Sequence, residues 1–69
     1  MKKLNNEVVA KRLAKARGNK TREEVAKYVG VTVSALGMYE RGERVPRDET
    51  KIKLAKCYDK DVQELFFEK

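Results

Sequence analysis

The sequence predicts an all-α fold, a compact bundle of five short helices. Apolar side chains recur at helical spacing in separate short stretches, the first of which contains Val9, Leu13 and Ala16. No stretch alternates in the manner of a half-buried strand, and β-branched residues cluster only over residues 29–33. Turn residues such as Gly18-Asn19 separate the helical stretches. These observations together favour helices over strands along the whole chain.

Length and composition exclude several classes of protein. A chain of 69 residues suits one domain with a small core. It contains no apolar run of the ~20 residues that a membrane span needs, and no apolar segment of the secretory kind near its start. Cys57 is the single cysteine, which suits a reducing compartment, so we expect a cytoplasmic protein with no membrane partner.

The chain lacks the usual groups of metal sites and of nucleophilic catalysis. It contains no histidine and one cysteine. A metal site is therefore not expected, and neither is a nucleophile–base pair. We accordingly expect no catalytic residues, no enzymatic activity and no cofactor.

The positive charge of the chain is concentrated near its N-terminus. The formal net charge is +6, and residues 1–20 contain seven basic side chains with Glu7 as their one acidic group. Basic and acidic groups cancel in the remainder. A basic surplus favours polyanionic partners through counterion release. The same surplus also suits a solubilising surface, so it supports nucleic-acid binding without deciding it.

Two short helices joined by a tight turn are predicted at the centre of the chain. Thr21 and Glu24 fit a capping box at the start of the first helix. Gly30 is placed to end that helix in the left-handed conformation, and Thr32 is placed to cap the next one. Two helices this short, with a glycine in the turn between them, predict a helix-turn-helix.

A further helix is predicted before this unit. It begins near Asn6 or Glu7, after a polar segment at 1–6 that we interpret as a flexible arm. The arm carries Lys2 and Lys3. Residues 7–69 are then the folded domain.

Two more helices are predicted after the unit. Asp48 is the expected N-cap of the first, which should run to about Tyr58. Lys51 lies on its apolar stripe, so we expect the stem of this side chain to pack and its ammonium to reach water. Asp61 is the expected N-cap of the last helix.

A set of anchor residues has a spacing that is characteristic of a known family. The set is Thr21 to Ala26, Gly30, Leu36, Tyr39, Glu40-Arg41-Gly42, Arg44, Pro46 and Leu54-Ala55. It resembles the phage repressor/Cro-like (XRE-type) helix-turn-helix family of transcriptional regulators, over about residues 8–67. The resemblance implies a compact five-helix lambda-repressor-like DNA-binding domain. It also implies a sequence-specific regulator that binds double-stranded operator DNA, with repression the expected outcome.

The resemblance also implies which residues read the DNA. The helix at about 32–41 would enter the major groove, with its exposed edge facing the bases. The candidate base contacts are Arg22, Val33, Ser34, Gly37 and Met38. Arg22 stands where the family usually has Gln, and it could pair with a guanine, hold a phosphate or remain solvated. Because this edge is poor in polar groups, DNA shape is expected to contribute to specificity.

A second set of residues is expected to contact the DNA backbone. Its members are Lys20, Thr21, Arg41, Arg44 and Arg47. Such contacts position a protein on DNA without reading its sequence. Each of these side chains could equally be a solvated surface group, and the clustering of three arginines after the recognition helix favours the phosphate interpretation.

Three apolar residues at the C-terminus predict an interface. Leu65, Phe66 and Phe67 are adjacent, so one helix face cannot bury all of them, and Phe67 is the expected surplus. A homodimer that uses these three residues is the favoured interpretation, and Phe67 folded back on the first helix is the alternative. The same surface suits an alternative function, a protein-interaction module such as an antitoxin-like partner. The sequence does not identify such a regulatory partner.

Overall fold

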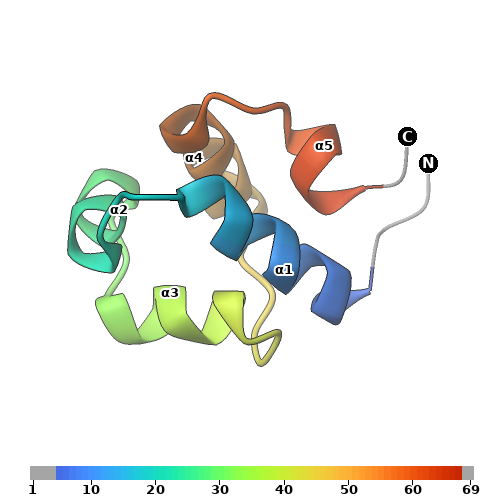
Figure 1. The fold of residues 1–69 in the computed structure, drawn as a ribbon, viewed down its shortest axis with the longest axis horizontal. Coiled ribbons are helices and arrows are strands. Elements are labelled where there is room, and N and C mark those ends of the chain that lie inside the picture. Colours follow the sequence, from blue (N-terminus) through green and yellow to red (C-terminus); the bar gives the residue numbers. More distant parts are fainter. Residues whose placement is uncertain (1–4, 68–69) are drawn as a thin grey trace.

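The computed structural model describes residues 5–67, which form five α-helices and confirm the all-α prediction (Figure 1). Their bounds are α1 Asn6–Arg17, α2 Arg22–Val29, α3 Val33–Glu40, α4 Asp48–Tyr58 and α5 Val62–Phe66. Helix α2 packs against α3 and α4, and α1 packs against α3 and α5. The helix-turn-helix unit, α2 and α3, is therefore supported directly by α1 and α4, and α5 packs against these two helices.

One core joins all five helices. The largest fully buried side chains are Leu13, Val25, Leu36 and Leu54, which come from α1, α2, α3 and α4 in turn. Helix α5 adds apolar side chains from its last turn to the same cluster. Because each helix contributes to one cluster, none of them can be displaced without exposing apolar surface of its neighbours.

The chain enters α1 through an asparagine cap. The Asn5 side chain accepts a hydrogen bond from the backbone N–H of Val8 at 3.0 Å, and Asn6 is the first helical residue. Asn5 and Asn6, which the prediction placed in an arm at 1–6, are therefore the N-cap and the first residue of α1. Lys2 and Lys3 lie outside the described residues.

The turn between α2 and α3 has the predicted geometry. The Thr21 hydroxyl accepts from the backbone N–H of Glu24 at 3.1 Å, and the Thr32 hydroxyl accepts from the backbone N–H of Ala35 at 2.9 Å. Gly30 adopts φ 85° and ψ 32°, and its N–H and that of Val31 both donate to the Ala26 carbonyl. The left-handed glycine therefore ends α2 and turns the chain into α3.

The Thr21–Glu24 pair differs from the predicted capping box in one respect. The Glu24 carboxylate accepts from the Thr21 hydroxyl at 3.3 Å. In a full capping box the carboxylate would instead accept from the N-cap backbone N–H. That bond forms at the start of α5, where the Asp61 N–H donates to Glu64 at 3.1 Å. Asp61 is thus the N-cap of the last helix, as predicted.

The start of α4 differs from the prediction. Arg47 is the N-cap residue, with extended backbone at φ −66° and ψ 160°, and Asp48 is the first helical residue. Asp48 therefore cannot cap the helix. Its carboxylate lies 3.7 Å from the ammonium of Lys51, one turn further on.

Lys51 is buried, contrary to the expectation that its ammonium reaches water. Only 7% of its side chain is exposed. The ammonium lies 5.5 Å from the ring centroid of Phe66 and 5.7 Å from that of Phe67. Aromatic faces attract cations, so the two rings replace part of the hydration that the ammonium loses.

The predicted C-terminal interface is also largely buried. Leu65 and Phe66 are each 3% exposed and belong to the core, and Phe67 is half-buried and packs against it. Arg12 donates to the carbonyl of Glu64 at 2.6 Å, which ties this end of the chain to α1. The prediction that Leu65 and Phe66 form a dimer interface is therefore wrong for the folded domain, because their surface is already used.

The conformation of Gly30 generates a stability prediction. No atom lies within 4 Å of a methyl group built at Gly30, so Gly30→Ala tests backbone strain without a clash. We expect the free energy of unfolding to fall by about 1–2 kcal/mol, since the left-handed region disfavours a side chain. Gly30→Asn should lose less, because asparagine tolerates this conformation. Urea unfolding measures both variants, and an unchanged Gly30→Ala midpoint would contradict the assigned turn.

Candidate nucleic-acid interface

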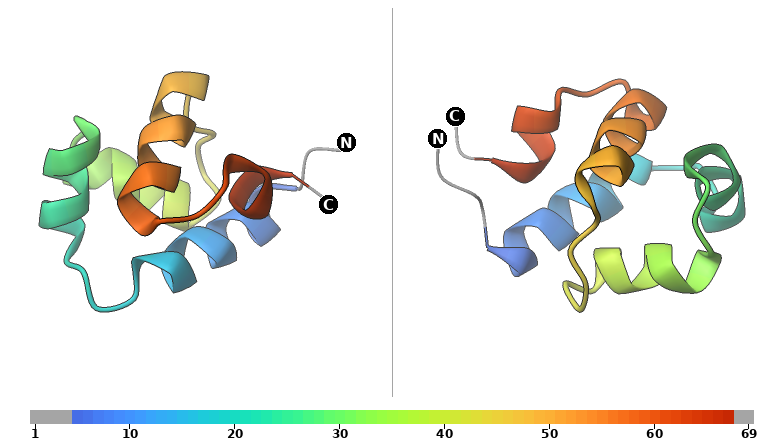
Figure 2. Two further views of the ribbon diagram at one scale, coloured as in Figure 1. Left: turned by 90° about the horizontal axis from the view of Figure 1, so that it is seen from above. Right: turned by 180° about the vertical axis from the view of Figure 1, so that it is seen from behind.

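Helix α3 lies along one edge of the molecule. Figure 1 shows it on the side opposite α5, and the view from behind in Figure 2 shows the same arrangement. Leu36 and Tyr39 anchor its inner face, with 0% and 6% of their surface exposed. The outer face of α3 is therefore held in a fixed orientation and is covered by no other helix.

The exposed edge of α3 presents three of the predicted base contacts. Val33 is 40% exposed, Ser34 is exposed and Met38 is half-buried. Val33 and Ser34 occupy the first turn, directly after the Thr32 cap. The first turn of a recognition helix is the part that lies nearest the base edges. The edge thus offers one hydroxyl and two apolar surfaces to a ligand.

Gly37, by contrast, is buried, which corrects the prediction that it faces outward. A methyl group built at this position would lie 3.0 Å from Nη1 of Arg41 and 3.9 Å from Nη1 of Arg22. The two guanidinium groups therefore cover the bare backbone of Gly37. A glycine leaves room for such an approach, and this is why its surface is hidden although it lies beside the exposed edge.

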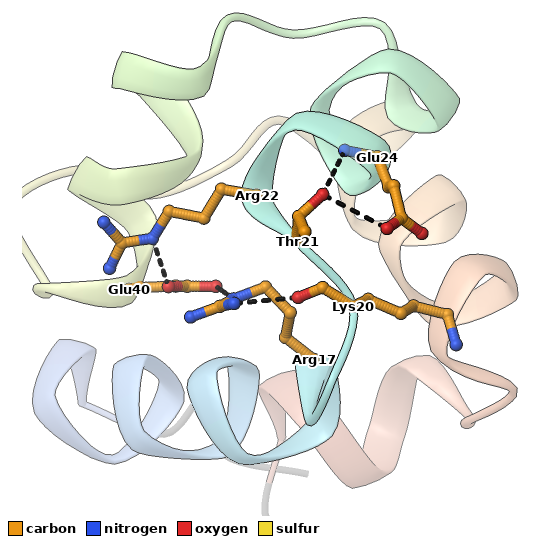
Figure 3. A network of polar contacts seen from close by, with 6 residues as sticks. All are labelled: Arg17, Lys20, Thr21, Arg22, Glu24 and Glu40. Atoms are coloured by element: carbon orange, nitrogen blue, oxygen red, sulfur yellow. Dashed lines mark hydrogen bonds and ion pairs between the residues drawn. The ribbon is translucent and has the colours of Figure 1, made fainter.

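Arg22 is held by a buried carboxylate. Glu40 lies at the end of α3 with only 1% of its side chain exposed, and it is bracketed by two arginines (Figure 3). Its Oε2 accepts from Nε of Arg17 at 2.7 Å, and its Oε1 accepts from Nε of Arg22 at 3.0 Å. The hydrogen bond to Glu40 raises the pKa of Arg17. One carboxylate thereby links α1, α2 and α3.

The role of Glu40 was not predicted from the sequence. A signal for it was present, because Glu40 follows Leu36 by four residues and so lies on the same inner face of the helix. A carboxylate on that face needs a basic partner. The sequence alone did not indicate that the partners come from both preceding helices.

The predicted backbone contacts fall into two groups. Lys20, Arg44 and Arg47 are exposed, and no hydrogen bond or ion pair engages their side chains within residues 5–67. Thr21 is exposed, but its hydroxyl bonds to Glu24. Arg41 donates from Nε to Glu43 at 2.9 Å, a bond that raises the pKa of Arg41 and lowers that of Glu43.

Part of the basic surplus near the N-terminus has a structural role. Arg12 donates to the backbone carbonyl of Glu64 in α5, and Arg17 pairs with Glu40 and also donates to the Lys20 carbonyl at 2.9 Å. Lys11 and Lys15 are exposed. The net charge thus overstates the number of cations that remain for an external anion.

Tyr58 carries an unsatisfied hydroxyl. The residue is 7% exposed, and its oxygen is buried without a hydrogen-bond partner. Burial raises the pKa of this phenol, and the Glu40 carboxylate raises it further. The ring is therefore a packing group of the core, as its helical spacing predicts.

Other kinds of site find little support in the described part of the chain. Within residues 5–67, no three or more His, Cys, Asp or Glu side chains gather as metal ligands would. A cavity of about 100 Å³ lies between the start of α1 and the loop after α3, lined by Val9, Tyr39 and Pro46 among others. No described helix has the length and apolar character of a membrane span.

The comparison with family models decides the family. The model described as helix-turn-helix matches residues 9–65, nearly the whole chain. The chain belongs to the XRE-type helix-turn-helix family. It is accordingly a DNA-binding transcriptional regulator, as the resemblance implied, and its fold and family are those of transcriptional regulators.

Two solved structures illustrate the relationship. The crystal structure of the restriction-modification controller protein C.AhdI from Aeromonas hydrophila is 32% identical with a TM-score of 0.79, over 87% of this chain and 94% of that one. The solution structure of an SOS-response transcriptional repressor, LexA, from Eubacterium rectale has a TM-score of 0.85 at 22% identity. It covers 100% of this chain and 76% of that one, and shares the fold. No curated protein sequence matches significantly.

The burial of Glu40 generates a second prediction. Glu40→Ala leaves Arg17 and Arg22 without their partner, and we expect the free energy of unfolding to fall by about 2 kcal/mol. The loss is smaller than for a fully buried pair, because 23% and 42% of the two arginine side chains are exposed. Glu43→Ala is the matched control, since its pair with Arg41 is exposed and should contribute little. Equal losses in urea unfolding would contradict the buried network.

The raised pKa of Tyr58 generates a third prediction. In the unfolded chain a phenol ionises near pH ~10, whereas the buried phenol stays neutral at that pH. Its contribution to stability is thus present below that pH and is lost as the pH rises above it. Tyr58→Phe should preserve the melting temperature at pH ~7 and reduce its decline towards pH ~11. Parallel declines in both proteins would contradict this assignment.

Proposed function

We propose that this protein is a repressor that recognises its operator with α3 in the major groove of double-stranded DNA. The observation that carries the proposal is the fixed orientation of α3 at the edge of the domain. Its inner face is anchored by Leu36, Tyr39 and Glu40, and its outer edge is free. A helix presented in this way matches the dimensions of the major groove.

Base readout is assigned to the exposed edge of α3. Ser34 offers a hydroxyl to a base edge, and Val33 and Met38 offer apolar contacts to thymine methyl groups. Arg22, at the start of α2, offers its remaining guanidinium nitrogens beside this edge. With one polar side chain on the edge itself, the shape and deformability of the DNA carry part of the specificity.

Backbone contacts are assigned to exposed cations on both sides of α3. Lys20 precedes α2, and Arg44 and Arg47 follow α3 in the loop that leads to α4. Thr21 contributes through the backbone at the start of α2, since its hydroxyl is used in the cap. Arg41 completes the set. These groups place the domain on the duplex, and α3 then reads the sequence.

The biological setting is part of the same proposal. We expect a cytoplasmic, non-enzymatic protein that needs no cofactor and acts as a homodimer on a twofold-symmetric site. The contacts first assigned to Leu65 and Phe66 are not available for this dimer. Among residues 5–67, the large apolar side chains that remain exposed are Tyr28, Val33, Val45 and Ile52.

A protein-interaction module is the second candidate function, and the main observation expected to support it is absent. That hypothesis depended on an exposed surface at Leu65, Phe66 and Phe67. Two of these side chains are core residues and the third is half-buried. DNA binding is therefore the function that the geometry supports best.

Salt dependence tests the proposal. Duplexes selected by the intact chain from a random library should bind with an affinity that falls at least about tenfold between ~50 and ~200 mM salt, because several phosphate contacts release counterions. Ser34→Ala should change the preferred bases at one position. Arg44→Ala should weaken all duplexes alike and reduce the salt slope by about 1.

Fluorescence anisotropy at several salt concentrations measures these quantities. Lys53→Ala is a suitable control, because Lys53 is an exposed cation in α4 and outside the proposed contact set. An affinity that does not depend on salt, or that is equal for every duplex sequence, would refute the proposed function.

A further inference from the structure

Two guanidinium groups converge on one point above α3. The Nη1 atoms of Arg22 and Arg41 both lie within 4 Å of the position that a Gly37 side chain would occupy. The two arginines come from different elements, since Arg22 begins α2 and Arg41 follows the last residue of α3. The pair therefore depends on the fold rather than on a local run of charge.

Each guanidinium is fixed by a carboxylate on the side away from this point. Arg22 donates Nε to Glu40 at 3.0 Å. Arg41 donates Nε and Nη2 to Glu43, at 2.9 Å and 3.4 Å. Within residues 5–67, no hydrogen bond or ion pair engages Nη1 of either arginine. The unengaged Nη1 groups of both arginines thus lie close to the same point.

The arrangement brings two like charges together, which is unfavourable unless anions balance them. Glu40 and Glu43 supply part of this balance. Both arginine side chains remain accessible, at 42% and 51% exposure. An external anion that reaches both Nη1 atoms would complete the balance and accept several charge-assisted hydrogen bonds.

We propose that Arg22 and Arg41 together bind one backbone phosphate of the DNA, at the point beside α3 where their guanidinium groups meet over Gly37. This assignment rests on the proposed function, and it gives Arg22 a phosphate as its ligand in place of a guanine. Glu40 and Glu43 are positioning residues for the two guanidinium groups. Gly37 contributes by the absence of a side chain and touches no base.

The donor geometry of Arg41 favours a phosphate over a guanine. A guanine is read by two parallel donors of one guanidinium. Arg41 has already used its Nε and Nη2 for Glu43, so a single nitrogen remains to it. A phosphodiester presents two unesterified oxygens that carry the charge, and single donors from two directions can each take one.

Neutral phosphate replacements test the proposal. The probes are a duplex selected by the intact chain and a set of copies, each with one phosphate replaced by an uncharged methylphosphonate. For the unmodified chain, one replacement should lower the affinity about tenfold, as expected for the loss of charge-assisted hydrogen bonds. Arg22→Ala and Arg41→Ala should each bind the unmodified duplex more weakly and lose less than the unmodified chain at that same phosphate, and the double variant should lose nothing further there.

Arg47→Ala is the matched control. It removes an exposed arginine outside the pair, so it should weaken binding and remain sensitive at the phosphate assigned to Arg22 and Arg41. Reduced sensitivity at one phosphate in Arg22→Ala and at a different phosphate in Arg41→Ala would overturn the proposal. The proposal would also be overturned if Arg22→Ala remained fully sensitive to every methylphosphonate and its base preference changed. That combination is the signature of a guanine contact. Failure of the unmodified chain to select any duplex would refute the proposed function itself.

Gly37→Ala provides an independent test. The new methyl group would lie 3.0 Å from Nη1 of Arg41, the flexible end of a side chain, so the guanidinium must move while the helix stays intact. Alanine also favours the helix interior over glycine. We expect a melting temperature that is unchanged or higher. The affinity for the unmodified duplex should fall several-fold, and the methylphosphonate at the assigned phosphate should then cost less affinity than it costs the unmodified chain. Unchanged affinity and an unchanged methylphosphonate profile would overturn the role of Gly37.

Discussion

The buried carboxylate of Glu40 is the interaction on which the geometry of this domain depends. It lies at the end of α3 and joins Arg17 of α1 to Arg22 of α2 through charge-assisted hydrogen bonds of 2.7 Å and 3.0 Å. A carboxylate with 1% exposure is stable only when its partners are in place. The network therefore requires all three helices to keep one relative arrangement. Apolar packing alone would tolerate small shifts, whereas this geometry does not.

That requirement connects stability to recognition. The same hydrogen bonds that satisfy Glu40 also determine where Arg22 lies, beside the exposed edge of α3. A small domain has little apolar surface to bury, so a polar network at the junction of three helices is a large part of what makes it rigid. A recognition helix must keep its register against the bases, and Glu40 is the residue that couples this register to the rest of the core.

Much of the fold follows from local sequence signals, because each signal acts over a few residues. The caps at Thr21 and Thr32 and the left-handed turn at Gly30 were predictable, since each depends on neighbouring backbone groups. The surroundings of the Lys51 and Phe66 side chains were harder to predict, because these side chains come from two helices and pack against each other. Helical periodicity identified which residues face inward, but it could not show that an ammonium would be covered by aromatic rings.

In the candidate site, too, the features set by local sequence were predictable and those set by tertiary contacts were not. The exposed edge at Val33 and Ser34 was predictable from the anchors that face the other way. Gly37 was wrongly predicted to be exposed, because its burial comes from two arginine side chains. Arg22 is remote in sequence, and Arg41 is close in sequence but reaches Gly37 with the end of a flexible side chain. A glycine in a helical pattern indicates open space, and which group fills that space is decided by tertiary structure.

The central claim is that the edge formed by α3 and the cations around it is the DNA-binding face. The most direct measurement is the titration of ¹⁵N-labelled protein with a selected duplex, followed residue by residue in amide NMR spectra. We expect the largest shift changes at Lys20 to Arg22, along α3 and through the loop to Arg47, with little change in α5 and the second half of α4. Changes concentrated on α4 and α5, with α3 unaffected, would contradict it.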